Sequence, residues 1–358
     1  MRQESRERRE RKARIAVVGA GLVGHRHALA IGASDRAVLA AIVDPSPEAA
    51  ALAHALAAPY HALLGDLLRQ RREPDGGLDG VILATPNALH AEGARACIAA
   101  GVPVLVEKPF VTDVAEGAAI VAEAERAGVP LLVGHHRRHT GAFAAARETV
   151  ASGALGRIVA ARATTWLAKP DDYFKEPWRR EEGAGPVRVN LVHDVDLLRA
   201  LVGEVAEVHA FAARGRGHAV EDAAVAILRF ESGALGTLSV SDNVAAPCSW
   251  ELTAREDPAF PPTDATYAWI GGTHGALELP SAAVWSHPGE RSWKRAIART
   301  HPPVGNDDAL TAQIANFAAV IAGEAAPLVT GTDGLRAVAI VEAVHRSART
   351  GRTERPEV

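Results

Sequence analysis

Short apolar runs alternate with stretches of helical periodicity over the first third of the chain. The runs occupy 15–18, 38–43, 80–83, 102–106 and 130–133. Between them, apolar residues recur about every 3.6 positions, as in 88–100 and 114–127, which predicts helices. Strands that are apolar on both faces and joined by helices form parallel sheets covered on both sides. The pattern therefore predicts a doubly wound α/β domain over residues 14–138.

The pattern changes beyond residue 139. Strand candidates become longer, alternate apolar with polar positions, and occupy 158–166, 205–213, 223–230, 234–240 and 266–270. Glycine turns such as 231–233 join neighbouring runs, which is typical of hairpins. Helical patterns follow at 190–201, 307–322 and 334–349. We predict an α+β domain over 139–358, with a largely antiparallel open sheet and two helices that close the chain.

Composition narrows the class of protein. The chain has 358 residues, about two domains' worth, and a net charge of −4, which gives no reason to expect nucleic-acid binding. Cys97 and Cys248 are far apart and lack metal-ligand spacing, which favours a reducing compartment. Residues 1–13 read as a flexible, Arg-rich tail rather than a signal peptide, and no stretch has 18 charge-free apolar residues. We expect a cytoplasmic protein that spans no membrane.

The first strand leads into a glycine-rich turn of the form G-x-G-x-x-G, made by Gly19, Gly21 and Gly24 with Leu22 and Val23 between the last two. Such a turn between a strand and a helix brings backbone N–H groups close to a pyrophosphate.

Asp44 follows the second strand, 20 residues after Gly24, where a carboxylate binds ribose hydroxyls. Its charge would repel a 2′-phosphate, and residues 45–47 supply no cation. We therefore predict a Rossmann domain that binds NAD, with NADP the weaker alternative.

Two further loops follow strands of this sheet, at the edge where ligands bind. Thr85, Pro86 and Asn87 come after the third apolar run, with His90 beyond them. We expect Thr85 and Pro86 to contact the cofactor and include Asn87 as a contact. The alternative is that Thr85 or Asn87 caps a helix. For His90, a cofactor contact and an ordinary surface position remain open.

Glu107 and Lys108 follow the fourth apolar run, and Lys108 is one of only five lysines in the chain. An ammonium at this edge can stabilise the alkoxide that develops when an alcohol is oxidised. The alternative is a structural ion pair between Lys108 and Glu107.

A Gly- and Pro-containing segment, 183–186, precedes the helix pattern that carries Asn190, His193 and Asp194 on one face. His193 is the best candidate for the general acid/base, because the pKa of histidine lies near neutral pH.

These motifs occur in an order that resembles the Gfo/Idh/MocA oxidoreductase family, from about residue 13 to 349. The resemblance extends to Arg137 and Arg138 after the last Rossmann strand and to the pair at 221–222. It implies a C-terminal α/β domain whose open sheet often forms the oligomer interface, so we expect a homodimer or homotetramer. It also implies that substrate lies between the domains, over the nicotinamide.

The resemblance assigns catalytic roles to Lys108 and His193. One position departs from the pattern, because the family's dehydrogenases have an aspartate four residues before the histidine and this chain has Val189. Asn190 is the nearest polar replacement, and an amide orients a hydroxyl but takes no proton. Acid/base chemistry then falls on His193 together with Lys108.

Candidate substrate residues lie in two segments. The basic run 135–139 contains His136, which we expect to face the substrate; a metal site is disfavoured because no carboxylate or cysteine adjoins the run. The loop 166–180 contains Lys169, Tyr173 and Trp178. Cations and aromatic rings together suit a sugar or cyclitol acid, and the alternative is that the aromatic residues belong to the core.

The sequence therefore predicts an NAD-dependent dehydrogenase that oxidises a secondary alcohol of a sugar, polyol or derivative. Two other functions remain open. A transient oxidation followed by elimination would give NAD-assisted glycoside hydrolysis, and a protein that only binds NAD would act as a sensor.

Overall fold

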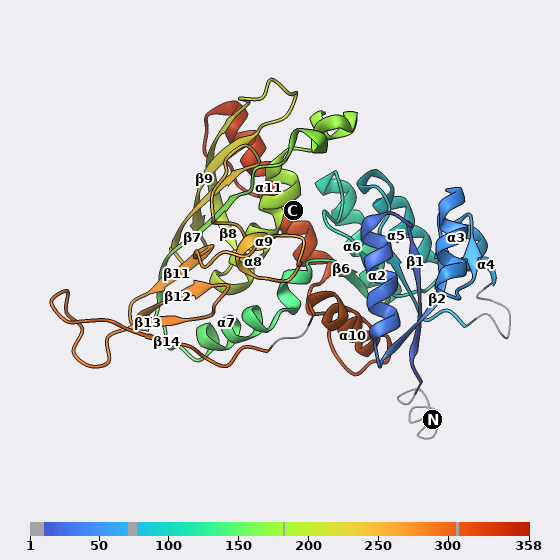
Figure 1. Cartoon of the computed structure of the whole chain (residues 1–358), viewed down its shortest axis with the longest axis horizontal. Coiled ribbons are helices and arrows are strands. Elements are labelled where there is room, and N and C mark those ends of the chain that lie inside the picture. The colour runs from blue at the N-terminus through green and yellow to red at the C-terminus, as the bar shows by residue number, and fades with distance from the viewer. Residues whose placement is uncertain (1–10, 71–76, 182, 306–307) are drawn as a thin grey trace. The chain divides into compact units, whose positions relative to one another are not determined.

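The computed structural model describes residues 11–70, 77–181, 183–305 and 308–358, so most of the predicted tail lies outside the described residues. The chain divides into two compact units (Figure 1). The described residues within 1–139, 307–335 and 358 form the first, and those within 140–306 and 336–357 form the second. Among the described residues, no helix is both long enough and apolar enough to cross a membrane.

The first unit contains a six-stranded parallel sheet in the order β3-β2-β1-β4-β5-β6. Its strands are β1 (Ala13–Val18), β2 (Ala37–Val43), β3 (Tyr60–His61), β4 (Gly80–Leu83), β5 (Val104–Val106) and β6 (Leu131–Val133). The strand order reverses at β1, the strand that leads into the glycine-rich turn. This is the arrangement of a Rossmann fold. The predicted doubly wound parallel sheet is confirmed.

Helices pack against the apolar strands of this unit. The helices are α2 (Leu22–Ala33), α3 (Pro47–Ala55), α4 (Leu64–Gln70), α5 (His90–Ala99), α6 (Val114–Ala127) and α10 (Ala309–Ile321). Helix α10 comes from late in the chain, yet Ile314 and Phe317 lie in the same core as Ile15 and Ile82. A side chain at Gly80 would approach Ile321 to 2.7 Å, so this glycine lets α10 pack closely against β4.

The second unit contains an eight-stranded mixed sheet in the order β14-β13-β12-β11-β7-β10-β9-β8. Its strands are β7 (Ile158–Trp166), β8 (Val205–Ala213), β9 (Ala223–Phe230), β10 (Leu235–Ser241), β11 (Ala268–Gly272), β12 (Gly275–Leu279), β13 (Val284–Ser286) and β14 (Ala298–Thr300). Among the described strands of this sheet, only β7 and β10 pair in parallel. The largely antiparallel sheet is therefore confirmed.

One face of this sheet is covered by helices, as the alternation along β9 shows. Ala224, Ala226, Leu228 and Phe230 point into the core, whereas the side chains between them are exposed. The helices of this unit are α7 (Gly141–Ala151), α8 (Val192–Val202), α9 (Trp250–Thr253) and most of α11 (Gly331–Thr350). In Figure 1, α7, α8 and α11 lie on one side of the strands. The other face exposes Val159, Phe211, Val225, Ile227 and Leu235.

Candidate functional site

The glycine-rich turn has the geometry that a bound pyrophosphate requires. Gly19 adopts φ +100°, and a side chain there would come within 2.4 Å of the Ala84 carbonyl oxygen. At Gly24 a side chain would come within 1.8 Å of the Gly19 carbonyl oxygen, so both positions require glycine. A side chain at Gly21, in contrast, would meet nothing within 4 Å. Leu22 and Val23 are exposed beside this open space, which leaves room for a ligand over the start of α2.

Asp44 is fixed at the end of β2. Its carboxylate accepts hydrogen bonds from the backbone N–H groups of Ala20 and Ser46, both at 2.8 Å. Burial alone would raise the pKa of Asp44, but the hydrogen bonds from Ser46 and Ala20 outweigh it and lower the pKa. The carboxylate is therefore charged at neutral pH and held beside the glycine-rich turn, as binding of an adenosine ribose requires.

The predicted loop after β4 lies against this turn and carries a polar atom that suits a ligand. The Thr85 hydroxyl is buried and has no hydrogen-bond partner among the described residues. Pro86 precedes a short 3-10 helix that begins at Asn87. His90 is 1% exposed, and its ring nitrogens lie 2.9 Å and 3.0 Å from the carbonyl oxygens of Pro109 and Thr85. The surface alternative for His90 is therefore wrong. The open space at Gly21 and the Thr85 hydroxyl both fit a dinucleotide.

We expect Gly21→Ala to weaken NAD binding about tenfold or more without unfolding the protein, because the methyl group enters open space that the pyrophosphate would occupy. The measurement is calorimetric titration with NAD. Gly32→Ala is the matched control, since Gly32 lies in α2, the helix that follows Gly21, and its added methyl group also meets nothing within 4 Å. Equal affinities for the two variants would contradict the assignment of the pyrophosphate site.

Glu107 is the centre of a buried polar cluster at the end of β5. One carboxylate oxygen lies 2.6 Å from Nε2 of His27 in α2, and the other accepts a hydrogen bond from the Lys108 backbone N–H at 3.1 Å. Gly134 follows β6 and leaves room for this carboxylate, because a side chain there would come within 2.7 Å of it. Burial would raise the pKa of Glu107, but His27 and the nearby Lys108 and His136 outweigh it and lower the pKa to about 2. Glu107 therefore ties the Lys108 backbone to the helix of the glycine-rich turn.

This lowered pKa predicts an acid-dependent loss of stability. The ordinary value is 4.5, so the contribution of Glu107 is complete above about pH 4.5 and is lost as the pH falls toward 2. A difference of about 2.5 units corresponds to about 3 kcal/mol. We expect Glu107→Gln to lower the unfolding free energy by about that amount at pH 7 and to flatten the acid limb. Urea unfolding followed by far-UV circular dichroism from pH 7 to 3 measures both effects, and parallel acid limbs in wild type and variant would contradict them.

The basic run after β6 is largely buried. Arg137 and Arg138 are 2% and 7% exposed, and Arg138 lies 3.4 Å from Asp333 in an ion pair within the same unit. Burial and the Arg137 guanidinium lower the pKa of His136 to about 3, so its imidazole is neutral at pH 7. Among the described residues, no group of three or more histidine, cysteine or acidic side chains is arranged to hold a metal ion.

In the second unit, the segment that carries the predicted catalytic residues begins with an unusual turn. Residues Val187–Leu191 are π-helical, and α8 starts only at Val192, two residues later than the sequence pattern indicated. The Glu221 carboxylate accepts a hydrogen bond from the Val187 N–H at 3.1 Å, which stabilises the start of the turn. Asn190 lies in the turn, and its side-chain oxygen is buried and accepts no hydrogen bond from the described residues.

His193 lies in the first turn of α8 and is 5% exposed. The next residue, Asp194, is completely buried and accepts hydrogen bonds from the hydroxyl groups of Thr165 at 2.8 Å and of Tyr267. Thr165 belongs to β7, and Tyr267 immediately precedes β11. These bonds fix the start of α8, and with it His193, against the sheet.

Three predicted substrate residues form one cluster. Lys169 Nζ lies 3.5 Å from the Asp242 carboxylate and 4.7 Å from the centre of the Tyr173 ring. The Arg179 guanidinium carbon lies 4.1 Å from the centre of the Tyr173 ring and 5.3 Å from the centre of the Trp178 ring. Burial lowers the pKa of Lys169 and raises that of Asp242. The attraction between the two groups opposes both shifts, and Asp242 is the carboxylate of the chain that pairs with Lys169.

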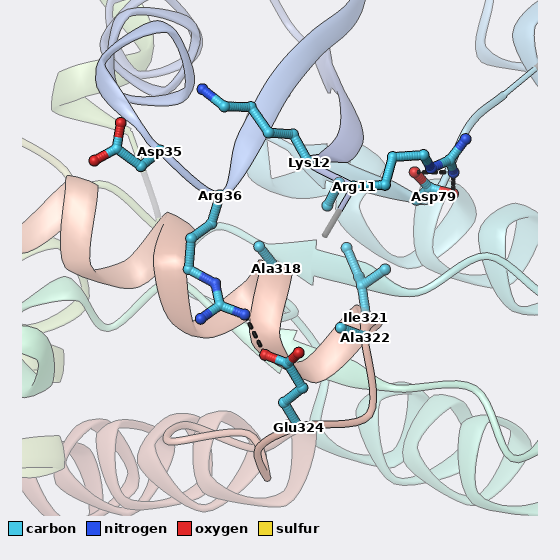
Figure 2. A pocket seen from close by; sticks show the side chains of 10 residues that line it. Arg11, Lys12, Asp35, Arg36, Asp79, Ala318, Ile321, Ala322 and Glu324 are labelled. Atoms are coloured by element: carbon cyan, nitrogen blue, oxygen red, sulfur yellow. Dashed lines mark hydrogen bonds and ion pairs between the residues drawn. The ribbon is translucent and has the colours of Figure 1, made fainter. Parts of the chain in front are cut away.

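The opposite end of the first sheet contains a pocket of about 300 Å³ (Figure 2). Arg11 pairs with Asp79 at 2.7 Å, Arg36 pairs with Glu324, and the Lys12 ammonium donates to the Ser34 carbonyl oxygen. Ala318, Ile321 and Ala322 of α10 also line it. These cations already have partners in the chain. We therefore interpret the pocket as the place where α10 packs against the sheet and not as a ligand site.

Comparison with known proteins agrees with this geometry. Residues 13–135 match an oxidoreductase family with an NAD-binding Rossmann fold, and residues 143–278 match the GFO/IDH/MocA C-terminal domain. The chain is 30% identical to the 1,5-anhydro-D-fructose reductase of Ensifer adhaerens over 77% of this chain and 79% of that protein. It is also 30% identical to the D-apiose dehydrogenase of Paraburkholderia graminis, over 94% of this chain and 88% of that protein.

A solved structure extends the likeness to three dimensions. The WlbA dehydrogenase of Bordetella pertussis, in complex with NADH and UDP-GlcNAcA, is 29% identical and has a TM-score of 0.76 over 97% of this chain and all of that one. The glycine-rich turn, the fixed Asp44 and the two sheets agree with these matches. The chain therefore belongs to the Gfo/Idh/MocA family of NAD-binding oxidoreductases.

Proposed function

We propose that this protein is an NAD-dependent dehydrogenase that oxidises a secondary alcohol of a sugar, cyclitol or sugar acid. The observation that carries the proposal is the setting of His193, whose neighbour Asp194 accepts hydrogen bonds from Thr165 in β7 and from Tyr267, the residue before β11. A base that removes a proton from a bound alcohol must be held in place. Such anchoring favours a catalytic role for His193, because a protein that only senses NAD needs no positioned base.

Each catalytic residue has a separate role in this proposal. His193 takes the hydroxyl proton, and the Lys108 ammonium stabilises the negative oxygen that develops. The free side-chain oxygen of Asn190 accepts a hydrogen bond from a substrate hydroxyl and so orients it. Bound NAD supplies the acceptor for the hydride. Val189 supplies no carboxylate at the position where the family resemblance implies an aspartate, so this proposal assigns the proton to His193.

The proposed cofactor residues lie in the glycine-rich turn, at the end of β2 and in the segments that follow β4 and β5. They are Gly19, Gly21, Leu22, Val23, Gly24, Asp44, Thr85, Pro86, Asn87, His90, Glu107 and Lys108. The fixed carboxylate of Asp44 favours the free ribose hydroxyls of NAD over the 2′-phosphate of NADP.

The relatives and the cluster at Lys169 support the proposed substrate class. D-apiose and 1,5-anhydro-D-fructose, named in two of the relatives, are neutral sugars, whereas UDP-GlcNAcA is acidic. We propose that Lys169, Tyr173, Trp178 and His136 contact the substrate, and that an acidic group would share Lys169 with Asp242. Lys169→Met should then raise the KM for acidic substrates far more than for neutral ones. Equal changes in the two classes would argue against an anionic substrate.

The open face of the second sheet supports a proposal about assembly. Phe211, Val225, Ile227 and Leu235 are each at least half exposed on neighbouring strands β8, β9 and β10. Apolar side chains gathered on one face mark protein interfaces. We propose that this face joins copies of the chain in a homodimer or homotetramer, and that the protein works in the reducing cytoplasm, where Cys97 and Cys248 remain thiols.

The test mixes purified protein and NAD with a panel of sugars, cyclitols and their acids and follows NADH absorbance. Sustained NADH formation that Lys108→Met slows about 10²-fold or more would support the dehydrogenase. A burst of NADH without accumulation would favour transient oxidation and glycoside hydrolysis, for which the departure at Val189 leaves room. Tight NAD binding without turnover of any panel member would favour a sensor.

A further inference from the structure

A second pocket lies entirely within the second unit, next to the π-helical turn that precedes α8. Its volume is about 330 Å³. It is lined by the glycine segment at 183–185, by Arg188 of the turn, by Arg214 and Glu221 beyond the end of β8, and by α11. A cavity of this size accommodates a small metabolite. None of these residues belongs to the catalytic or cofactor groups proposed above.

Positive charge exceeds negative charge around this pocket. The Arg188 guanidinium pairs with Glu342 of α11, but its Nε is buried without a hydrogen-bond partner among the described residues. Arg214 and Arg349 are exposed at the pocket and form no hydrogen bond or ion pair with the described part of the chain. Three guanidinium groups therefore face two carboxylates, those of Glu221 and Glu342.

The remaining titratable group in the pocket does not cancel this excess. Burial lowers the pKa of His345, with Arg188 and Arg349 acting in the same direction and the carboxylates of Glu221 and Glu342 opposing them. The imidazole is therefore neutral at pH 7. The pocket carries about one net positive charge, and planar guanidinium groups bind carboxylate and phosphate oxygens with matched geometry.

The pocket is mechanically connected to the proposed catalytic residues. Arg188 and Asn190 belong to the same π-helical turn, and His193 follows in the first turn of α8. Glu221 lines the pocket and also bonds the N–H of Val187 at the start of that turn. A side chain at Gly185 would come within 2.1 Å of the Glu221 carboxylate, so this packing has no slack. π-helical turns are frequent at functional sites.

We propose that this pocket is a regulatory site for a small carboxylate- or phosphate-bearing anion. The anion bridges Arg214 and Arg349 and competes with Glu342 for Arg188, which shifts the π-helical turn and changes the activity of His193. The regulatory half of this inference rests on the proposed function, whereas anion binding does not.

The test uses inorganic phosphate and succinate as probes on the full-length protein with NAD present, at constant ionic strength. Isothermal titration should show saturable binding of at least one probe, and the double variant Arg214→Ala/Arg349→Ala should weaken it at least tenfold. The control is Arg255→Ala/Arg295→Ala, which removes the same charge from two exposed positions of the same unit outside the pocket. Which probe binds distinguishes a phosphate ligand from a dicarboxylate.

Coupling is read without turnover, by hydrogen exchange in residues 187–193. The bound probe should change exchange in that segment at least twofold in wild type and not in the pocket variant. No binding of either probe at 10 mM, or equal losses in pocket and control variants, would overturn the site. Binding without any change in exchange would overturn the regulation. Because neither readout needs a substrate, failure of the dehydrogenase assay is a separate result.

Discussion

Replacing His193 with alanine is expected to lower kcat by about 10² to 10⁴, the range that a positioned general base contributes. NAD affinity should stay within about twofold, because His193 belongs to the second unit and the glycine-rich turn to the first. Lys108 remains in the variant and, in the proposed mechanism, still stabilises the alkoxide, so the activity should fall without vanishing. Rapid-mixing measurement of NADH formation at saturating substrate separates this step from substrate binding.

Two comparisons make the result specific to proton transfer. His193→Asn keeps a polar side chain of similar volume in the buried position but removes the base, so its kcat should fall as far as that of the alanine variant. His209→Ala removes a half-buried imidazole of the same unit from β8 and should change kcat less than twofold. A wild-type rate in His193→Asn would show that His193 only orients the substrate. The proton would then have to leave by another route.

The strands were predictable because their signal is local. Strands β7, β8 and β9 have the bounds that the alternation indicated, since period-2 burial leaves its mark on every second residue. The short β3 and the strands β12 to β14 were missed, because runs of two to five residues give too few positions to establish a period. Recognition of the glycine-rich turn had the same local basis, as only glycine fits Gly19 and Gly24.

The contacts that position the site were not predictable, because they join distant parts of the chain. His27 and Glu107 are 80 residues apart, and neither residue's local pattern indicates the other. Asp242, which follows β10, pairs with Lys169 across 73 positions of the chain, so the sequence pattern gave no sign of this partner. The π-helical turn was also missed, because helical spacing does not distinguish it from α-helix over five residues. Sequence patterns thus predicted candidate reacting groups but not the residues that hold them in place.

Of the residues that hold the candidate site in place, Asp194 is the one whose loss we expect to lower the unfolding free energy of the second unit most. Asp194→Ala leaves the hydroxyl groups of Thr165 and Tyr267 buried without this acceptor, and each is about 1% exposed. An unsatisfied buried donor costs about 1 to 3 kcal/mol, so the two together should lower the unfolding free energy by about 4 kcal/mol. All six tryptophans lie between residues 166 and 293, within the second unit, so tryptophan fluorescence during urea unfolding reports on that unit alone.

The partners provide the matched controls. Thr165→Val and Tyr267→Phe each remove one donor and keep the carboxylate, so each should cost only about 1 kcal/mol. If Asp194 also positions His193, the pH dependence of kcat should shift in Asp194→Asn even where the protein remains folded, and the two single-donor variants should show smaller shifts. A loss of stability in Asp194→Ala no larger than in Thr165→Val would mean that the carboxylate is not the anchor of α8. An unshifted pH profile in folded Asp194→Asn would confine its role to holding the helix on the sheet.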